Sequence, residues 1–367
     1  GDTLYSHTYE DYDEDGNLIT ENLIGNLGSV THEMDPRGYN ECISSPYFSQ
    51  QCRYDSVGDL ISNITDGAED LYSYDELSQL SCENNASQSL TYTYDSLYNR
   101  TQKNGKVHGV NVLNELLATE NSRCSYDLNG NQISKQGPSG ISRFIYDPLN
   151  RLVEVVSEKQ KLNFVYDPLG RRLSNTVYTQ TAYGWKEADR ENYLYHDQYE
   201  IGALSLDNES KNLRVLGFNK HKNNPTTVSV ELEGQCFASI LDVQSNIRRL
   251  VGMNTRTVES RYDCTAFGEE AQTASHQVGL FNPWRFASKR LDPELGLIYF
   301  GKRYYDPLTG RWLSVDPAGF VDSVNLYQYL LNNPFYYFDP DGQEAATIAL
   351  TLWGTSQTGG LSLAALT

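Results

Sequence analysis

The sequence predicts an all-β protein in which short antiparallel strands follow one another as hairpins. Two observations predict this fold. Tyr-Asp pairs recur every 20 residues, a period typical of stacked repeats. The composition also suits strands joined by tight turns, with 27 tyrosines against 12 phenylalanines, 28 glycines and only 2 methionines. At 367 residues the chain is long enough to bury a sizeable core.

The repeat dominates the first half of the chain. Six Tyr-Asp pairs fall on two grids of the same period: Tyr54-Asp55, Tyr74-Asp75, Tyr94-Asp95, Tyr126-Asp127, Tyr146-Asp147 and Tyr166-Asp167. Asp35 extends the first grid with Met34 in place of tyrosine, and Tyr12-Asp13 is an out-of-phase copy. The tyrosine ends a strand and the aspartate opens a turn, because Asp, Asn, Pro and Gly supply turn conformations.

Each repeat has room for a hairpin. Twenty residues hold two strands of about six residues and two turns. One hairpin cannot bury its tyrosines, so the repeats must join into a continuous sheet that curls to protect its edges. We therefore interpret the tyrosines as structural residues.

Charge and motifs exclude several classes of protein. The formal net charge of -19 argues against a nucleic-acid partner, since such a partner requires a basic surface. The six cysteines, at 42, 52, 82, 124, 236 and 264, lack C-x-x-C spacing, so we expect free thiols and no metal site. Phosphate-binding and dinucleotide-binding loops are missing, so no cofactor is expected. The N-terminus starts in mid-pattern without a signal segment, which suggests a piece of a longer chain.

The sequence changes character from Pro283 onward. Short motifs rich in Arg, Tyr and Asp-Pro succeed one another: Arg285-Phe286-Ala287, Asp292-Pro293, Arg303-Tyr304-Tyr305-Asp306-Pro307, Gly310-Arg311-Trp312-Leu313 and Asn325-Leu326-Tyr327-Gln328-Tyr329. Two turns share one form, Asp316-Pro317-Ala318-Gly319 and Asp339-Pro340-Asp341-Gly342. In both, proline pre-sets φ and glycine permits positive φ.

Together the Tyr-Asp units and this run resemble YD-repeat proteins of the Rhs family, including the C component of Tc toxin complexes. The resemblance covers about residues 10 to 342. It implies a spiralling β-hairpin sheet that forms part of a hollow shell, with a C-terminal core or plug domain. The implied division is a YD-repeat shell over 1–280, an Rhs-associated core domain with an aspartyl autoprotease site over 281–342, and a variable cargo or tail over 343–367.

The resemblance also implies where the chain is cut. Residues 334–342 fit the family's P-x-x-x-x-D-P-x-G pattern, which marks the autoproteolytic boundary. Asp339 is the first catalytic candidate, and either Asp316 or Asp322 is its partner. Two close carboxylates can share a proton, and the aromatic residues before Asp339 favour a raised pKa. Arg311 is the expected charge partner.

The expected cleavage-site residues are Gly342 and Gln343, with the cut after Gln343 or close to it. Gln343 stands where the family commonly has leucine. The sequence does not decide whether this substitution slows or shifts the cut, nor whether the chain is an enzyme at all. If it is one, it is a single-turnover, self-cleaving aspartic peptidase.

The leading hypothesis is an encapsulating shell of a polymorphic Rhs-type toxin that releases a C-terminal effector held inside. The implied partners are that cargo polypeptide, an N-terminal shell portion or second shell subunit, and a secretion-system or toxin-injection component. The implied location is bacterial, with export from the cytoplasm. Two alternatives stay open: a non-catalytic YD-repeat surface or adhesion module that binds glycans or proteins, and an immunity or scaffold fragment.

Overall fold

The computed structural model describes residues 5–217, 225–271, 274–276, 280–321, 323–343 and 345–347. Within these residues the elements are strands and three short 3-10 turns, and no α-helix occurs. The helical turns described are far too short to span a membrane. The all-β prediction is therefore confirmed.

Two large antiparallel sheets, called the wall below, contain β1 to β27, and within each sheet every strand pairs with its neighbours in sequence. The eleven-stranded sheet comprises β1 (Thr8–Tyr12), β2 (Leu18–Asn22), β3 (Ser29–Met34), β4 (Asn40–Ser45), β5 (Phe48–Tyr54), β6 (Leu60–Thr65), β7 (Ala68–Tyr74), β8 (Leu80–Asn85), β9 (Ser89–Tyr94), β10 (Arg100–Lys103) and β11 (Lys106–Val107). The sixteen-stranded sheet comprises β12 (Gly109–Val110), β13 (Leu116–Ala118), β14 (Arg123–Tyr126), β15 (Gln132–Gly137), β16 (Gly140–Tyr146), β17 (Leu152–Val156), β18 (Gln160–Tyr166), β19 (Arg172–Thr181), β20 (Gly184–His196), β21 (Tyr199–Leu204), β22 (Ser210–Gly217), β23 (Thr226–Leu232), β24 (Gln235–Leu241), β25 (Ile247–Gly252), β26 (Val258–Arg261) and β27 (Ser275–His276).

The C-terminal part, residues 281–342, is called the core segment. Its elements are η2 (Phe286–Ser288), β28 (Arg290–Asp292), β29 (Leu297–Tyr299), β30 (Tyr304–Asp306), β31 (Arg311–Trp312), η3 (Leu330–Asn332) and β32 (Tyr337–Phe338). The strand β33 (Ala346–Thr347) follows the segment, and the 3-10 turn η1 (Ile24–Asn26) belongs to the wall. Strands β28 to β31 form a small sheet of four, and β32 pairs with β33.

Hydrogen bonds explain why tyrosine and aspartate recur together. The hydroxyl of Tyr74 donates to the Leu60 carbonyl at 2.8 Å, and that of Tyr94 donates to the Leu80 carbonyl at 2.7 Å. Each tyrosine thus ties its hairpin to the preceding one. Asp75 Oδ1 accepts the amides two and four residues later, each at 2.9 Å, and so closes the turn. Each repeat therefore contributes one hairpin to the sheet, as the spacing predicts.

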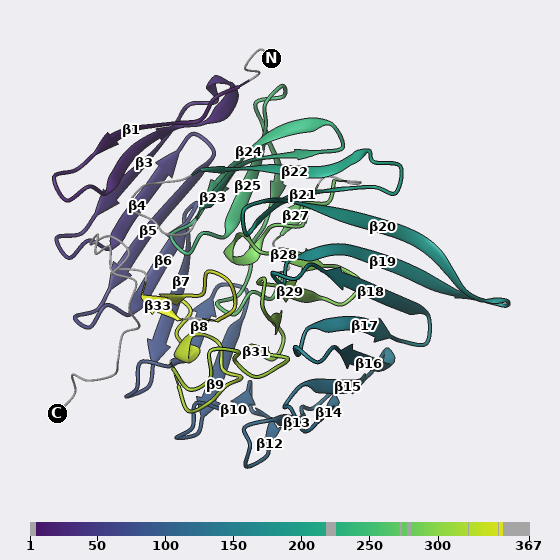
Figure 1. Ribbon diagram of the computed structural model, residues 1–367. Coiled ribbons are helices and arrows are strands. Elements are labelled where there is room, and N and C mark those ends of the chain that lie inside the picture. Colours follow the sequence, from purple (N-terminus) through teal and green to yellow (C-terminus); the bar gives the residue numbers. More distant parts are fainter. Residues whose placement is uncertain are drawn as a thin grey trace.

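The core segment lies between the two sheets (Figure 1). Wall residues Leu80 and Tyr92 share one hydrophobic cluster with Tyr305 and Trp312 of the core segment. A second cluster joins other strands of the wall to β29, β30 and the residue after β31. A third cluster brings β3 to β5 against β24 and β25. The wall therefore curves back on itself at one end, and the core segment fills the space at the other.

Buried ion pairs anchor the core segment to the wall. Arg172 donates to both oxygens of Asp292, at 2.5 and 3.0 Å. Asp306, itself buried, pairs at 2.7 Å with Lys135, which is partly exposed. Removing one member of a fully buried pair such as Arg172–Asp292 leaves an uncompensated buried charge and costs about 3–5 kcal/mol. These two Asp-Pro turns thus attach the core segment to the wall.

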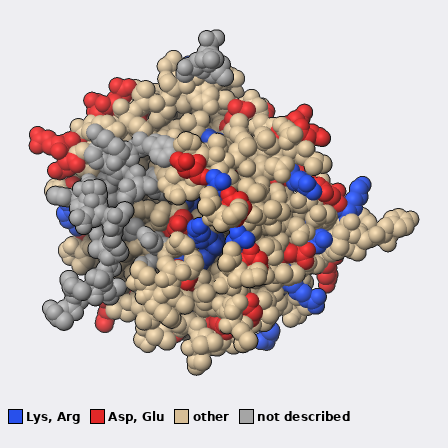
Figure 2. Space-filling view, viewed as in Figure 1, with Lys and Arg blue, Asp and Glu red and all other residues tan. Residues whose placement is uncertain are grey.

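Charge is unevenly distributed on the face shown in Figure 2. Acidic and basic residues both occur at the margin and near the middle, and the largest group of adjoining Lys and Arg atoms lies near the middle. The middle is where the core segment lies in the same view in Figure 1. Because the protein has a formal net charge of -19, a group of cations at the core segment makes this segment a candidate site.

Candidate active site

Asp339 opens a hairpin turn, residues 339–343, called the Asp339 loop. The loop follows β32, whose Phe338 pairs with Ala346 of β33. Asp339 is 5% exposed. Its Oδ1 accepts three successive backbone amides, those of Asp341 at 3.1 Å, Gly342 at 2.6 Å and Gln343 at 3.2 Å. One carboxylate oxygen thus fixes the backbone of the whole loop.

Gly342 is needed for this packing. Its φ of +89° lies in the region that glycine adopts most easily. A Cβ at this position would lie 3.1 Å from the Arg303 amide nitrogen and 3.3 Å from Phe300 Cβ. The loop therefore approaches the chain around residue 303 more closely than a larger residue allows.

The other turn of this form is built in the same way. Asp316 Oδ1 accepts the Ala318 amide at 2.8 Å. Asp316 Oδ2 then lies 2.6 Å from Arg303 Nη2, and Asp339 Oδ2 lies 3.6 Å from the same nitrogen. Each aspartate closes its own turn with one oxygen and directs the other to a shared guanidinium.

Arg303 holds the site together. It lies between β29 and β30, is 4% exposed and stacks 4.1 Å from the centre of the Trp312 ring. Besides the two carboxylates, its Nε donates to the Gly342 carbonyl at 2.5 Å. The Gly342–Gln343 peptide is therefore held at both ends, by Arg303 at its oxygen and by Asp339 at its nitrogen.

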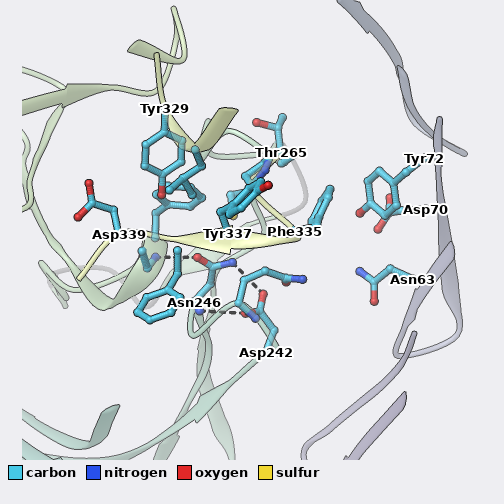
Figure 3. A pocket seen from close by; sticks show the side chains of 18 of the residues that line it. Asn63, Asp70, Tyr72, Asp242, Asn246, Thr265, Tyr329, Phe335, Tyr337 and Asp339 are labelled. Atoms are coloured by element: carbon cyan, nitrogen blue, oxygen red, sulfur yellow. Dashed lines mark hydrogen bonds between the residues drawn. The ribbon is translucent and has the colours of Figure 1, made fainter. Parts of the chain in front are cut away.

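Burial makes Asp339 an unusual carboxyl group. Figure 3 shows it at one end of a pocket beside Tyr329, with Tyr337 and Phe335 between it and the wall. Burial raises the pKa of Asp339 to about 6, although Arg303 and the Gly342 amide act in the opposite direction. A pKa near neutrality suits a group that both gives and takes a proton.

The other expected site residues lie as follows. Asp322 lies outside the described residues. Arg311 does not take the place expected for it: it donates to Asn99 Oδ1 at 3.0 Å and to the Asn114 carbonyl, both in the wall. The guanidinium beside Asp339 belongs instead to Arg303. The sequence showed both arginines in motifs of one kind, and nothing in it separated their roles.

Metal binding has no support among the residues that the structure describes, where no group of three His, Cys, Asp or Glu side chains could hold an ion. The six cysteines are free thiols.

Comparisons with known proteins agree with the fold. The family model described as Teneurin YD-shell matches residues 40–340. The tRNA nuclease WapA of Bacillus subtilis (strain 168) is 27% identical over 371 residues, which cover 93% of this chain and 15% of that protein. Toxin subunit YenC2 of Yersinia entomophaga is 50% identical over 68 residues, 18% of this chain and 7% of the subunit.

Among solved structures, TcdB2-TccC3-TEV superposes with a TM-score of 0.70 at 20% identity. The superposition covers 90% of this chain and 19% of that one. At this identity the likeness shows the fold. The chain spans less than a fifth of the length of each of these three relatives.

Proposed function

The chain belongs to the Teneurin YD-shell family, and we propose that it forms part of a toxin shell and cuts itself beside Gln343. The segment after the cut would be the effector, held inside the shell until its release. The names of the relatives support a toxin: they include tRNA nucleases, toxin subunits and a double-stranded DNA deaminase toxin. Several of these come from bacteria, which supports a bacterial, exported protein.

One observation carries the self-cleavage. Two carboxylates and a peptide carbonyl meet on one buried guanidinium, that of Arg303. A guanidinium at a carbonyl oxygen stabilises the negative charge that develops there when water attacks the carbon. A carboxyl group at the amide nitrogen is placed to protonate the leaving amine.

We propose a role for each group. Asp316, paired with Arg303 at 2.6 Å, is the base that takes a proton from the attacking water. The hydroxide adds to the carbonyl carbon, and Arg303 holds the oxyanion. The C–N bond then breaks as protonated Asp339 gives its proton to the amine. The products are a new C-terminal carboxylate and a free N-terminal amine. Gly342–Gln343 is the peptide held at both ends, and the bond after Gln343 is the other candidate.

The shell role rests on the packing of the core segment. Its buried ion pairs and shared hydrophobic clusters fix it to the wall. Cleavage at the Asp339 loop would therefore leave the shell intact and release only the residues C-terminal to the cut. The implied partners are the cargo polypeptide, the rest of the shell and a component that delivers the toxin.

The test is the intact mass of the protein extended by a reporter domain after Thr367. We expect two polypeptides with a break beside Gln343, and the masses identify the bond. Asp339→Asn should stay whole. Asp167→Asn is the matched control, because Asp167 closes a wall turn in the same way, and it should be cut like the parent. A folded, uncut parent would refute self-cleavage.

One observation favours the alternative of a binding module. Apolar side chains stand exposed at successive wall turns, such as Val57 at 63%, Leu77 at 57%, Leu149 at 69% and Leu169 at 72%. Exposed apolar rows mark surfaces that bind other proteins. A folded, uncut parent would make this the better account of the chain.

A further inference from the structure

The Asp339 loop is held from outside as well as by its own aspartate. Its three successive carbonyls, at positions 340 to 342, each accept a hydrogen bond from the core segment. The donors are Lys289 Nζ to Pro340 at 2.5 Å, the Lys302 backbone amide to Asp341 at 2.9 Å and Arg303 Nε to Gly342 at 2.5 Å. Three carbonyls and three amides of the loop are therefore hydrogen-bonded, which leaves the loop little freedom.

Lys289 differs from the other two donors. Lys302 acts through its backbone, and Arg303 belongs to the site itself. Lys289 lies between η2 and β28 and reaches the loop with its side chain alone. It contacts the Pro340 carbonyl, which lies N-terminal to the Gly342–Gln343 peptide.

The charge of Lys289 suits this contact. Burial lowers the pKa of Lys289 to about 8, as does Arg214 nearby, while Asp339 and Asp341 favour its charged form. The ammonium therefore prevails at neutral pH. Its nitrogen also lies 5.8 Å from the centre of the Phe300 ring. A charged donor makes a stronger hydrogen bond to a carbonyl than a neutral one does.

We propose that Lys289 is a positioning residue for the self-cleavage: by holding the Pro340 carbonyl it keeps the Gly342 carbonyl on Arg303 and the Gln343 amide on Asp339. This role of Lys289 rests on the proposed function, and it adds to the site a residue outside the carboxylate pair. The physical reason is that reacting groups must be aligned closely, and a shift of about 1 Å can slow a reaction about 100-fold. Without the lysine, the Pro340 carbonyl loses this donor, whereas the Asp341 and Gly342 carbonyls keep theirs.

The experiment follows cleavage as the protein is made by cell-free translation, with the uncut fraction sampled over time. Lys289→Met should slow cleavage about 10- to 100-fold. Lys289→Arg should restore most of the rate, since a guanidinium can donate to the same carbonyl. Lys302→Met is the matched control and should match the parent, because only the Lys302 backbone contacts the loop. Thermal melting of each purified variant checks that it is folded.

A second readout does not require cleavage. Hydrogen exchange at the amides of Asp341 and Gly342 should speed up in Lys289→Met and stay unchanged in Lys302→Met. Parental cleavage and parental protection in a folded Lys289→Met variant would overturn the proposal. So would an arginine variant as slow as the methionine variant. If the parent itself stays whole, self-cleavage fails, and the exchange rates still decide whether Lys289 holds the loop.

Discussion

Asp167 of the wall and Asp339 of the core segment both close their turns with Oδ1, but their second oxygens have different partners. Asp167 Oδ1 accepts the amides of Leu169 and Arg171, each at 2.9 Å, and its Oδ2 pairs with the Arg171 side chain at 2.7 Å. Asp339 also closes its turn with Oδ1, yet its Oδ2 faces Arg303, which it shares with Asp316. A turn is encoded locally, whereas reactivity depends on which distant group meets the second oxygen.

The two environments move the pKa in opposite directions. For Asp167, burial acts upward but is outweighed by the hydrogen bonds from Arg171, so the pKa falls below its usual value. For Asp339, burial prevails over Arg303 and the loop amides, and the pKa rises to about 6. The same turn thus lowers the pKa of a structural carboxyl group on the wall, while the pKa of its counterpart in the core segment is raised.

The largest effect should come from removing the second carboxylate. Asp316→Asn should slow self-cleavage by at least about 10³-fold, a loss typical of removing one member of a catalytic set. Asp322→Asn should be cut at the parental rate, because Asp316 already shares Arg303 with Asp339. Time courses of the uncut fraction measure both. A fast Asp316→Asn variant and a slow Asp322→Asn variant would assign the partner role to Asp322 instead.

Next in size is the loss of the shared guanidinium. Arg303→Met should destabilise the fold by about 3–5 kcal/mol, because it leaves two carboxylates near the site without their cation. Arg171→Met should lower stability by less than about 1 kcal/mol, since its ion pair with Asp167 is a third exposed on the arginine side. Urea unfolding gives both values. Equal losses of stability in the two variants would mean that Arg303 and Arg171 stabilise the fold to the same extent.

The pH dependence of stability should separate the regions further. The folded-state pKa of Asp339 lies above its ordinary value of 3.8, so the folded protein binds this proton more tightly than the unfolded chain does. The contribution of this proton to the free energy of unfolding is fully present below the pKa of the unfolded chain, and it is lost as the pH rises through about 6. Between pH 7 and pH 4 the parent should therefore gain about 1–3 kcal/mol relative to Asp339→Asn. Parallel unfolding curves for the two proteins across this range would contradict the raised pKa.

The sequence predicted more of the fold than of the site, for a physical reason. Spacing and turn residues are local, so they predicted the hairpins and both Asp-Pro-x-Gly turns. Even Leu241-Asp242, which lacks the tyrosine, closes a turn of the same kind through Gln244 and Asn246. Arg303 was not singled out because its role depends on contacts across the fold, where Trp312 and the Gly342 carbonyl fix its side chain. Arg311, closer in sequence to Asp316, is bound to the wall instead.

The smallest effect tests the wall aspartate itself. Asp167→Asn keeps an oxygen that can accept the turn amides and loses only the charge that faces Arg171. Stability should fall by less than about 1 kcal/mol, and self-cleavage should proceed at the parental rate. Urea unfolding and the cleavage time course check the two statements on one sample. A wall variant that folds normally but is no longer cut would show that the turns of the wall, too, position the Asp339 loop, and the contrast between the regions would then fail.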